Sequence, residues 1–215
     1  MISILKKPIF WLITLPVAAA LVWLLTLPDQ PSLTSAQVDP VAYRAEVQDE
    51  RLKKDKYMRT NADSPIPDKA NFKGLTYFDA DPTFRVLARL EPFPEGQAEK
   101  LVIKLTDGSE ETYEKYAHAT FTLAGKSCRL LVLKYQRSLT VLFQDATSGQ
   151  DTYGGGRYLD IESNSIANNQ VVLDFNAAYN PYCVYNPTYA CPLPPPENKL
   201  PVAVKAGERY VHTDE

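Results

Sequence analysis

From Phe84 onward, the sequence is a series of short segments in which apolar and polar residues alternate, separated by turn residues. A period of two is typical of β-strands with one buried face. The pairs Asp107-Gly108 and Ala124-Gly125 predict hairpins, and no long helical pattern intervenes, which argues against a parallel sheet. We therefore predict a mainly β domain, a small antiparallel β-barrel or sandwich whose closure protects the strand edges. The expected strands are residues 84–90, 101–105, 111–116, 118–123, 129–134, 139–144, 157–161, 171–175 and 202–205.

Residues 9–27 contain no charged side chain. A helix of this length spans the hydrocarbon core of a bilayer, which is roughly 30 Å thick. Lys6 and Lys7 precede it, so the positive-inside rule leaves residues 1–8 as a cytoplasmic tail and the rest of the chain outside the cytoplasm. We therefore predict a single-pass anchor in the lipid bilayer. The alternative is a cleaved signal peptide, and both interpretations export the remainder.

After the anchor, residues 28–38 form a polar linker that contains proline. Asp39 and Pro40 then predict the start of a helix over residues 39–59, with Asp39 as its N-cap. Residues 60–215 follow as the β-rich domain. The helix is expected to be a juxtamembrane spacer that is mostly exposed to solvent, because its apolar stripe is narrow; a partner-binding helix is the alternative. The stripe consists of Val41, Ala45 and Leu52, and the expected ion pairs are Asp49/Lys53, Glu50/Lys54, Arg51/Asp55 and Asp55/Arg59.

The charge of the chain argues against a nucleic-acid partner. The 215 residues contain 23 Lys and Arg against 26 Asp and Glu, a net charge of -3. Without Lys6 and Lys7, 21 basic residues face 26 acidic ones, so the exported part carries -5. An acidic domain is not attracted to phosphate backbones, nor to anionic lipid without an anchor.

Three ordered motifs give the chain a family resemblance. They are TYGGGRYLD at residues 152–160, DFNAAYNPYC at residues 174–183 and CPLPPPEN at residues 191–198. Together with Phe143–Gly149, Gly74–Phe78 and Ala206–Glu208, they resemble a bacterial and archaeal family known only as a domain of unknown function. The resemblance covers roughly Tyr43 to Tyr210, and it implies no established reaction.

The glycines at 154–156 and Arg157 allow two interpretations. Backbone N–H groups of such a loop, with the guanidinium, can bind an anion. Alternatively, the glycines permit a tight turn and Arg157 pairs with an acid such as Asp160 or Asp174, which is the favoured interpretation.

Polar residues cluster in the later motifs, where they either converge on a small polar ligand or cap turns. The candidate ligand-binding residues are Arg157, Asp174, Asn180, Tyr182 and Glu197. His118 is expected to be a hydrogen-bonded barrel histidine, with a catalytic base as the alternative.

Cys183 and Cys191 are close enough in sequence to form a disulfide in an exported protein, with free thiols or a metal site as alternatives. Cys128 is expected to be a buried small hydrophobe. We predict no metal and no cofactor, since no recognised metal-binding pattern occurs.

These features favour a membrane-anchored extracytoplasmic β domain that binds a small polar ligand or a membrane protein partner. One alternative is a hydrolase-like enzyme that uses Arg157 with Asp174 or Glu197. Another is a structural subunit of a membrane complex.

Overall fold

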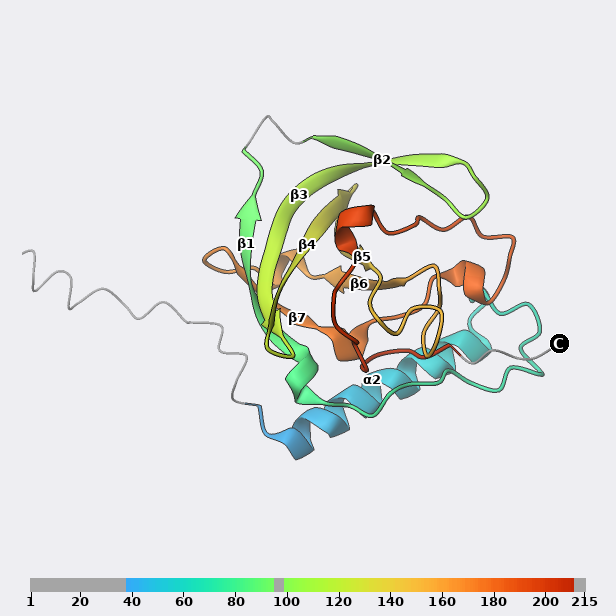
Figure 1. Cartoon of the computed structure of the whole chain (residues 1–215). Helices are drawn as coiled ribbons and strands as arrows, with labels where there is room; N and C mark the ends of the chain where they lie inside the picture. Colours follow the sequence, from blue (N-terminus) through green and yellow to red (C-terminus); the bar gives the residue numbers. More distant parts are fainter. Residues whose placement is uncertain (1–37, 95–98, 211–215) are drawn as a thin grey trace, which may run out of the picture. The chain divides into compact units, whose positions relative to one another are not determined.

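The computed structural model describes residues 38–94 and 99–210. In this part the chain forms one long helix, α2 (Pro40–Thr60), followed by an antiparallel sheet and short 3-10 turns (Figure 1). The strands are β1 (Arg85–Pro92), β2 (Lys100–Lys104), β3 (Glu110–Leu123), β4 (Lys126–Tyr135), β5 (Ser138–Phe143), β6 (Arg157–Ile161) and β7 (Gln170–Asp174).

The sheet has the strand order β6-β5-β4-β3-β1-β7, and β2 also pairs with β3. All pairings are antiparallel. β2 and β1 occupy successive parts of the same edge of β3, at residues 110–114 and 117–120. The sheet curls, as Figure 1 shows. The prediction of a mainly β fold with an antiparallel, barrel-like sheet is therefore confirmed.

The two strands predicted at residues 111–116 and 118–123 are one strand, β3. Its register with β4 shifts between Lys115 and Ala117, which leaves Tyr116 as an extra residue. A bulge of this kind bends a strand and changes which side chains face inward. Tyr113 accordingly belongs to a small core cluster on one face, whereas Ala117 and Phe121 belong to the main core.

The strand predicted at residues 202–205 is not formed. The alternation of buried and exposed residues on which the prediction was based is nevertheless present, since Val202, Val204 and Ala206 are buried in the main core. Its backbone groups, however, bond to a loop and to side chains: Ala146 donates to the Val202 carbonyl, and Val204 donates to Asp145. The segment therefore fills the concave side of the curled sheet (Figure 1) without joining it.

Asn198 separates β4 from β5. The register of these strands would place Leu131 opposite Leu142, but their ladder ends at Leu133 and Thr140. The fully buried Asn198 amide lies between them: it accepts from Leu131 N at 2.6 Å and donates to the Leu131 and Leu142 carbonyls at 2.9 and 2.8 Å. One side chain thus satisfies three backbone groups that the sheet leaves unpaired.

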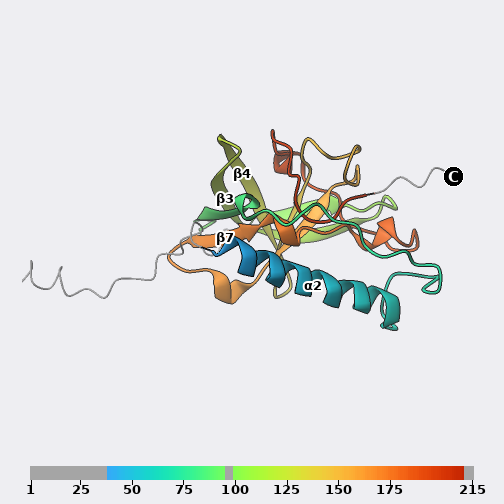
Figure 2. The same cartoon turned by 90° about the horizontal axis from the view of Figure 1, so that it is seen from below.

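Helix α2 begins as predicted, because Asp39 accepts from the N–H groups of Val41 and Ala42 at 2.8 Å. The helix is mostly exposed to solvent, as predicted, and its apolar stripe is part of that exposed surface: the exposed fractions of Val41 and Leu52 are 75% and 60%. The helix instead faces the domain with Tyr43 and Met58, both buried, and it lies along one side of the sheet beside β7 (Figure 2).

Two of the four ion pairs expected along α2 are present, Asp49/Lys53 at 2.8 Å and Asp55/Arg59 at 2.6 Å. Lys54 binds Glu208 rather than Glu50. Arg51 donates to the Phe78 carbonyl, and Asp55 accepts from Leu75 N. The helix is therefore tied to the domain by polar contacts along most of its length, which does not suit an isolated spacer.

The predicted anchor at residues 9–27, with the tail before it and most of the linker, lies outside the described residues. Within residues 38–94 and 99–210, no helix combines the length and hydrophobicity needed to cross a bilayer.

Replacing Asn198 by alanine is expected to destabilise the domain by about 3 kcal/mol, because three backbone groups lose their partner in a buried position. Chemical denaturation of the full-length protein, followed by circular dichroism, measures the free energy of unfolding. Asn164→Ala, at an exposed position, is the matched control and should change this energy by less than about 0.5 kcal/mol. Equal stabilities of the two variants would contradict the bridging role.

Candidate functional site

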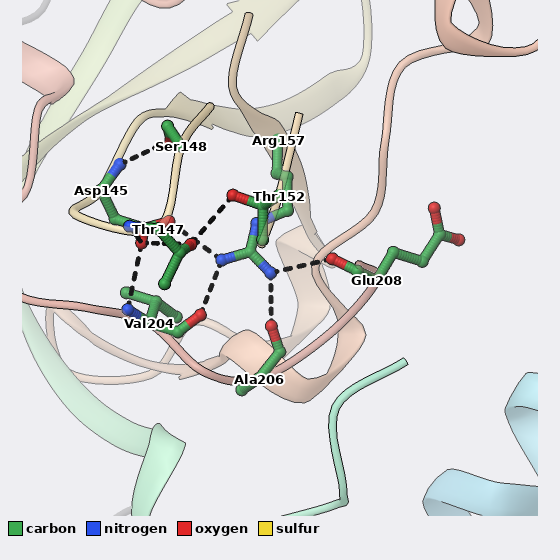
Figure 3. Close-up of polar contacts among 8 residues, drawn as sticks. All are labelled: Asp145, Thr147, Ser148, Thr152, Arg157, Val204, Ala206 and Glu208. Atoms are coloured by element: carbon green, nitrogen blue, oxygen red, sulfur yellow. Dashed lines mark hydrogen bonds and ion pairs between the residues drawn. The ribbon is translucent and has the colours of Figure 1, made fainter. Parts of the chain in front are cut away.

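Arg157 lies in the protein interior, with 1% of its surface exposed. Its guanidinium donates to Asp145 Oδ2 at 2.9 Å, to the carbonyls of Val204 at 2.8 Å and Glu208 at 3.2 Å, and to the Ala206 carbonyl (Figure 3). Burial lowers its pKa, and the Asp145 carboxylate opposes that effect. The acid paired with Arg157 is thus Asp145, not the expected Asp160 or Asp174.

The buried Nε of Arg157 has no hydrogen-bond partner among the described residues, whereas Asp145 accepts several hydrogen bonds. Besides Arg157, it accepts from Thr147 N and Oγ1 at 2.8 and 2.6 Å and from Val204 N at 3.1 Å. Four donors on one buried carboxylate compensate for its removal from water. The Arg157–Asp145 pair therefore joins β6, the loop after β5 and the C-terminal segment.

Gly156 does not contribute an open anion cradle. Its N–H donates to the Tyr153 carbonyl. Its φ is +94°, and an added Cβ would come within 2.6 Å of both the Phe143 carbonyl and Pro194 Cγ. These contacts support the interpretation of the glycines as a tight turn beside Arg157.

Glu208 connects the surroundings of Arg157 to helix α2. Arg157 binds its carbonyl, and its side chain points away from the guanidinium (Figure 3). The buried carboxylate accepts from Lys54 Nζ at 2.7 Å, Tyr185 Oη at 2.8 Å and Asn180 N at 2.8 Å. Burial, and then the Glu208 charge, raises the pKa of Tyr185. Glu208 thus links α2 to the segment after β7.

Beside this link lies a cleft, called here the α2 cleft, with a volume of about 360 Å³. It is bounded on one side by α2 and on the other by the ends of β1 and β7. Tyr43 Oη donates to Asp174 at 2.8 Å across it, and Arg85 Nε lies 3.8 Å from the same carboxylate. The charged and phenolic groups in its lining are Tyr43, Glu46, Glu50, Arg51, Lys54, Tyr77, Arg85 and Asp174.

A second cleft, the tyrosine cleft, has a volume of about 500 Å³. Tyr158, Tyr179, Tyr182 and Tyr189 line it, and Lys54 belongs to both clefts. The Lys54 ammonium lies 4.3 Å from the centre of the Tyr179 ring. Burial raises the pKa of Tyr182 to about 12, so this phenol is neutral at physiological pH.

The five predicted ligand-binding residues do not converge on one cavity. Asp174 lines the α2 cleft and Tyr182 lines the tyrosine cleft. Asn180 is buried beside Glu208, and Arg157 lies behind them in the interior. Glu197 lies elsewhere, where its Oε2 is 2.9 Å from Nε2 of His118 on β3.

Cys183 and Cys191 are neighbours in space as free thiols, with Cys183 N 3.2 Å from Cys191 Sγ. Burial raises the pKa of Cys191 to about 12. Their disulfide stays a prediction. Cys128 is buried, as expected. In the described part of the chain, no three His, Cys, Asp or Glu side chains are placed to hold a metal ion.

Sequence reasoning missed the inner face of α2, which carries Arg51 and Lys54. The signal is present in the spacing of Tyr43, Val47, Arg51, Lys54 and Met58, at intervals of three and four residues. Because Arg51 and Lys54 are charged, a search for apolar residues at helical spacing does not detect this face of the helix.

Comparison with known proteins places the domain in a family. A profile described as protein of unknown function (DUF1684) matches residues 70–209. The solution NMR structure of the uncharacterized protein from gene locus rrnAC0354 of Haloarcula marismortui is similar, with 37% identity and a TM-score of 0.61. The match covers 79% of this chain and 95% of that one. No curated protein matches the sequence.

Replacing Arg157 by methionine is expected to destabilise the domain by about 3 to 5 kcal/mol, because the Asp145 carboxylate stays buried without its counterion. Denaturation of the full-length protein measures the loss, with Arg137→Met at an exposed position as control. Adding Asp145→Leu should recover part of it, since the double variant buries no unpaired charge. A single variant as stable as the wild type would contradict this role.

Proposed function

The chain belongs to the family described as protein of unknown function (DUF1684). We propose that it is a membrane-anchored extracytoplasmic domain that binds a small polar ligand in the α2 cleft. The observation that carries the proposal is the lining of this cleft, where groups of both charges converge from α2, β1 and β7. Its volume of about 360 Å³ suits a small molecule.

The polar groups of the cleft are held in place before any ligand arrives. Asp174 accepts from Tyr43 Oη, and from Asn176 N and Nδ2 at 3.0 Å each. Lys54 is fixed by the buried Glu208. Groups ordered in advance lose little conformational entropy on binding, which favours a ligand site over a surface groove.

The membrane part of the proposal is supported by the sequence alone. Residues 9–27 are uncharged and follow Lys6 and Lys7, and the exported part carries a charge of -5. Such a segment is long enough to span a bilayer and would hold the acidic domain outside the cytoplasm.

The contacts favour binding over the hydrolase-like alternative. Arg157 has 1% exposure and four hydrogen bonds within the protein, so its guanidinium has no route to a substrate. Asp174 lines the α2 cleft, whereas Glu197 pairs with His118. These three residues do not form one reaction centre.

Blocking the α2 cleft tests the ligand site. Ala177 is exposed in its lining, so Ala177→Trp fills the cleft without removing a polar group; Ala203→Trp, also exposed, is the matched control. Thermal unfolding of the detergent-solubilised full chain is followed with acetate, succinate, L-glutamate, choline, phosphate and glucose. At least one probe should raise the midpoint in the wild type and the control, but not in Ala177→Trp. Identical responses in all three proteins would reject the site.

Fractionation tests the anchor. We expect the full-length chain in the membrane fraction after alkaline carbonate washing, and we expect protease added to intact spheroplasts to digest the β domain. Full-length protein in the cytosol would contradict the membrane and export proposals together. A shortened chain released outside the cytoplasm would contradict the anchor alone.

A further inference from the structure

The tyrosine cleft combines aromatic surface with groups that a ligand can reach. Tyr189 has 37% of its surface exposed, and the side chain of Lys54 has 33%. Asp160, which also lines the cleft, is exposed. The remaining lining residues are the half-buried Tyr158, Tyr179 and Tyr182, with Pro181, Ala190 and Cys191. Rings of this kind bury the apolar surface of a ligand, while the few polar groups orient it.

The tyrosine rings are held in place by contacts within the protein. Tyr158 Oη donates to the Pro192 carbonyl at 2.6 Å. The rings of Tyr158 and Tyr179 pack edge to face with their centres 5.8 Å apart, and those of Tyr182 and Tyr189 do the same at 5.5 Å. A ligand therefore meets a lining of rings that is already ordered, which reduces the entropy lost on binding.

Tyr179 positions two polar groups of different character in this cleft. The Lys54 ammonium lies 4.3 Å from the centre of its ring, and its hydroxyl donates to Asp160 Oδ2 at 2.8 Å. Lys54 also binds Glu208, but an ammonium carries three donors and a carboxylate has about four acceptor positions. The cleft therefore offers a ligand both a donor, on Lys54, and an acceptor, on Asp160.

The charges around the cleft favour a neutral ligand. Lys54 is balanced by the buried Glu208, and Asp160 shares a neighbouring cleft with Arg137 and Glu162, which have opposite charges. A carboxylate on the ligand would be repelled by Asp160. An ammonium on the ligand would be repelled by Lys54, which already lies over a ring. A hydroxyl both donates and accepts, so it suits the two groups together.

A sugar ring combines apolar C–H surface with several hydroxyls. We propose that the tyrosine cleft binds a neutral saccharide, whose ring packs against Tyr182 and Tyr189 and whose hydroxyls bind Lys54 and Asp160. The volume of about 500 Å³ lies within the usual range for small-ligand sites. This site is additional to the α2 cleft, with which it shares only Lys54.

The test uses the full chain in a detergent without a sugar headgroup. Calorimetric titration and thermal unfolding measure binding of glucose, N-acetylglucosamine, maltose and cellobiose. Cyclohexanol, choline and succinate are the comparison probes, as an apolar ring with one hydroxyl, a cation and an anion. At least one saccharide should bind, and more tightly than any comparison probe, because only the saccharides combine ring surface with several hydroxyls.

Tyr189→Ala removes an exposed ring from the lining and should weaken saccharide binding about tenfold. Tyr135→Ala is the matched control and should bind like the wild type: Tyr135 is 36% exposed and packs against one other tyrosine, Tyr113, outside the cleft. Asp160→Asn should weaken binding about fivefold, since it replaces charge-assisted hydrogen bonds by neutral ones. Glu162→Gln, at a nearby exposed position, should leave binding unchanged.

The outcomes also separate this inference from the proposed ligand site in the α2 cleft. Saccharide binding should persist in Ala177→Trp; its loss there would move the sugar to the α2 cleft and overturn the inference. Equal affinities of Tyr189→Ala and Tyr135→Ala would overturn the tyrosine cleft as the site. Binding of the comparison probes without any saccharide, or of no probe, would overturn the ligand class. The unfolding midpoint shows whether Tyr189→Ala is folded, and Asp160→Asn against Glu162→Gln decides the matter if it is not.

Discussion

The buried ion pair between Arg157 and Asp145 is the contact on which the rest of the architecture depends. A guanidinium and a carboxylate removed from water are stable only when nearly all of their hydrogen-bonding capacity is used. Here Nη1 and Nη2 of the guanidinium bind three carbonyls of the C-terminal segment, at Val204, Ala206 and Glu208, while the buried Nε has no partner among the described residues. The curled sheet is therefore filled by a coil whose backbone is held by side chains, in place of another strand.

The C-terminal segment also determines the geometry of the α2 cleft. Gly207, with φ at +77°, lets the chain pass close to the Ala178 and Phe175 carbonyls. The next residue, Glu208, then presents its carboxylate to Lys54 of α2. The position of a helix near the start of the domain is thus set by residues near its end, through a contact that spans most of the sequence.

Local chemistry predicted the local structure well. The N-cap at Asp39 and the turns at Gly108 and Gly125 involve neighbours in sequence, and these features were found where expected. The predictions failed where a distant partner decided the outcome. The alternation at 202–205 is that of a strand, yet Asp145 and Arg157 take its hydrogen bonds. Likewise, Arg157 was correctly expected to have an acid partner, but only the fold selects Asp145 over Asp160 and Asp174.

The open cleft is a physical consequence of the way α2 is attached. A helix with a continuous apolar face would pack closely against the sheet and exclude a cavity. The inner face of α2 instead carries Arg51 and Lys54 between Tyr43 and Met58, and each long polar side chain reaches across to its own partner. Charged groups of this length hold two elements apart, because each must keep hydrogen bonds that close packing would remove. The space between them consequently has a defined shape and is lined by charged groups of both signs.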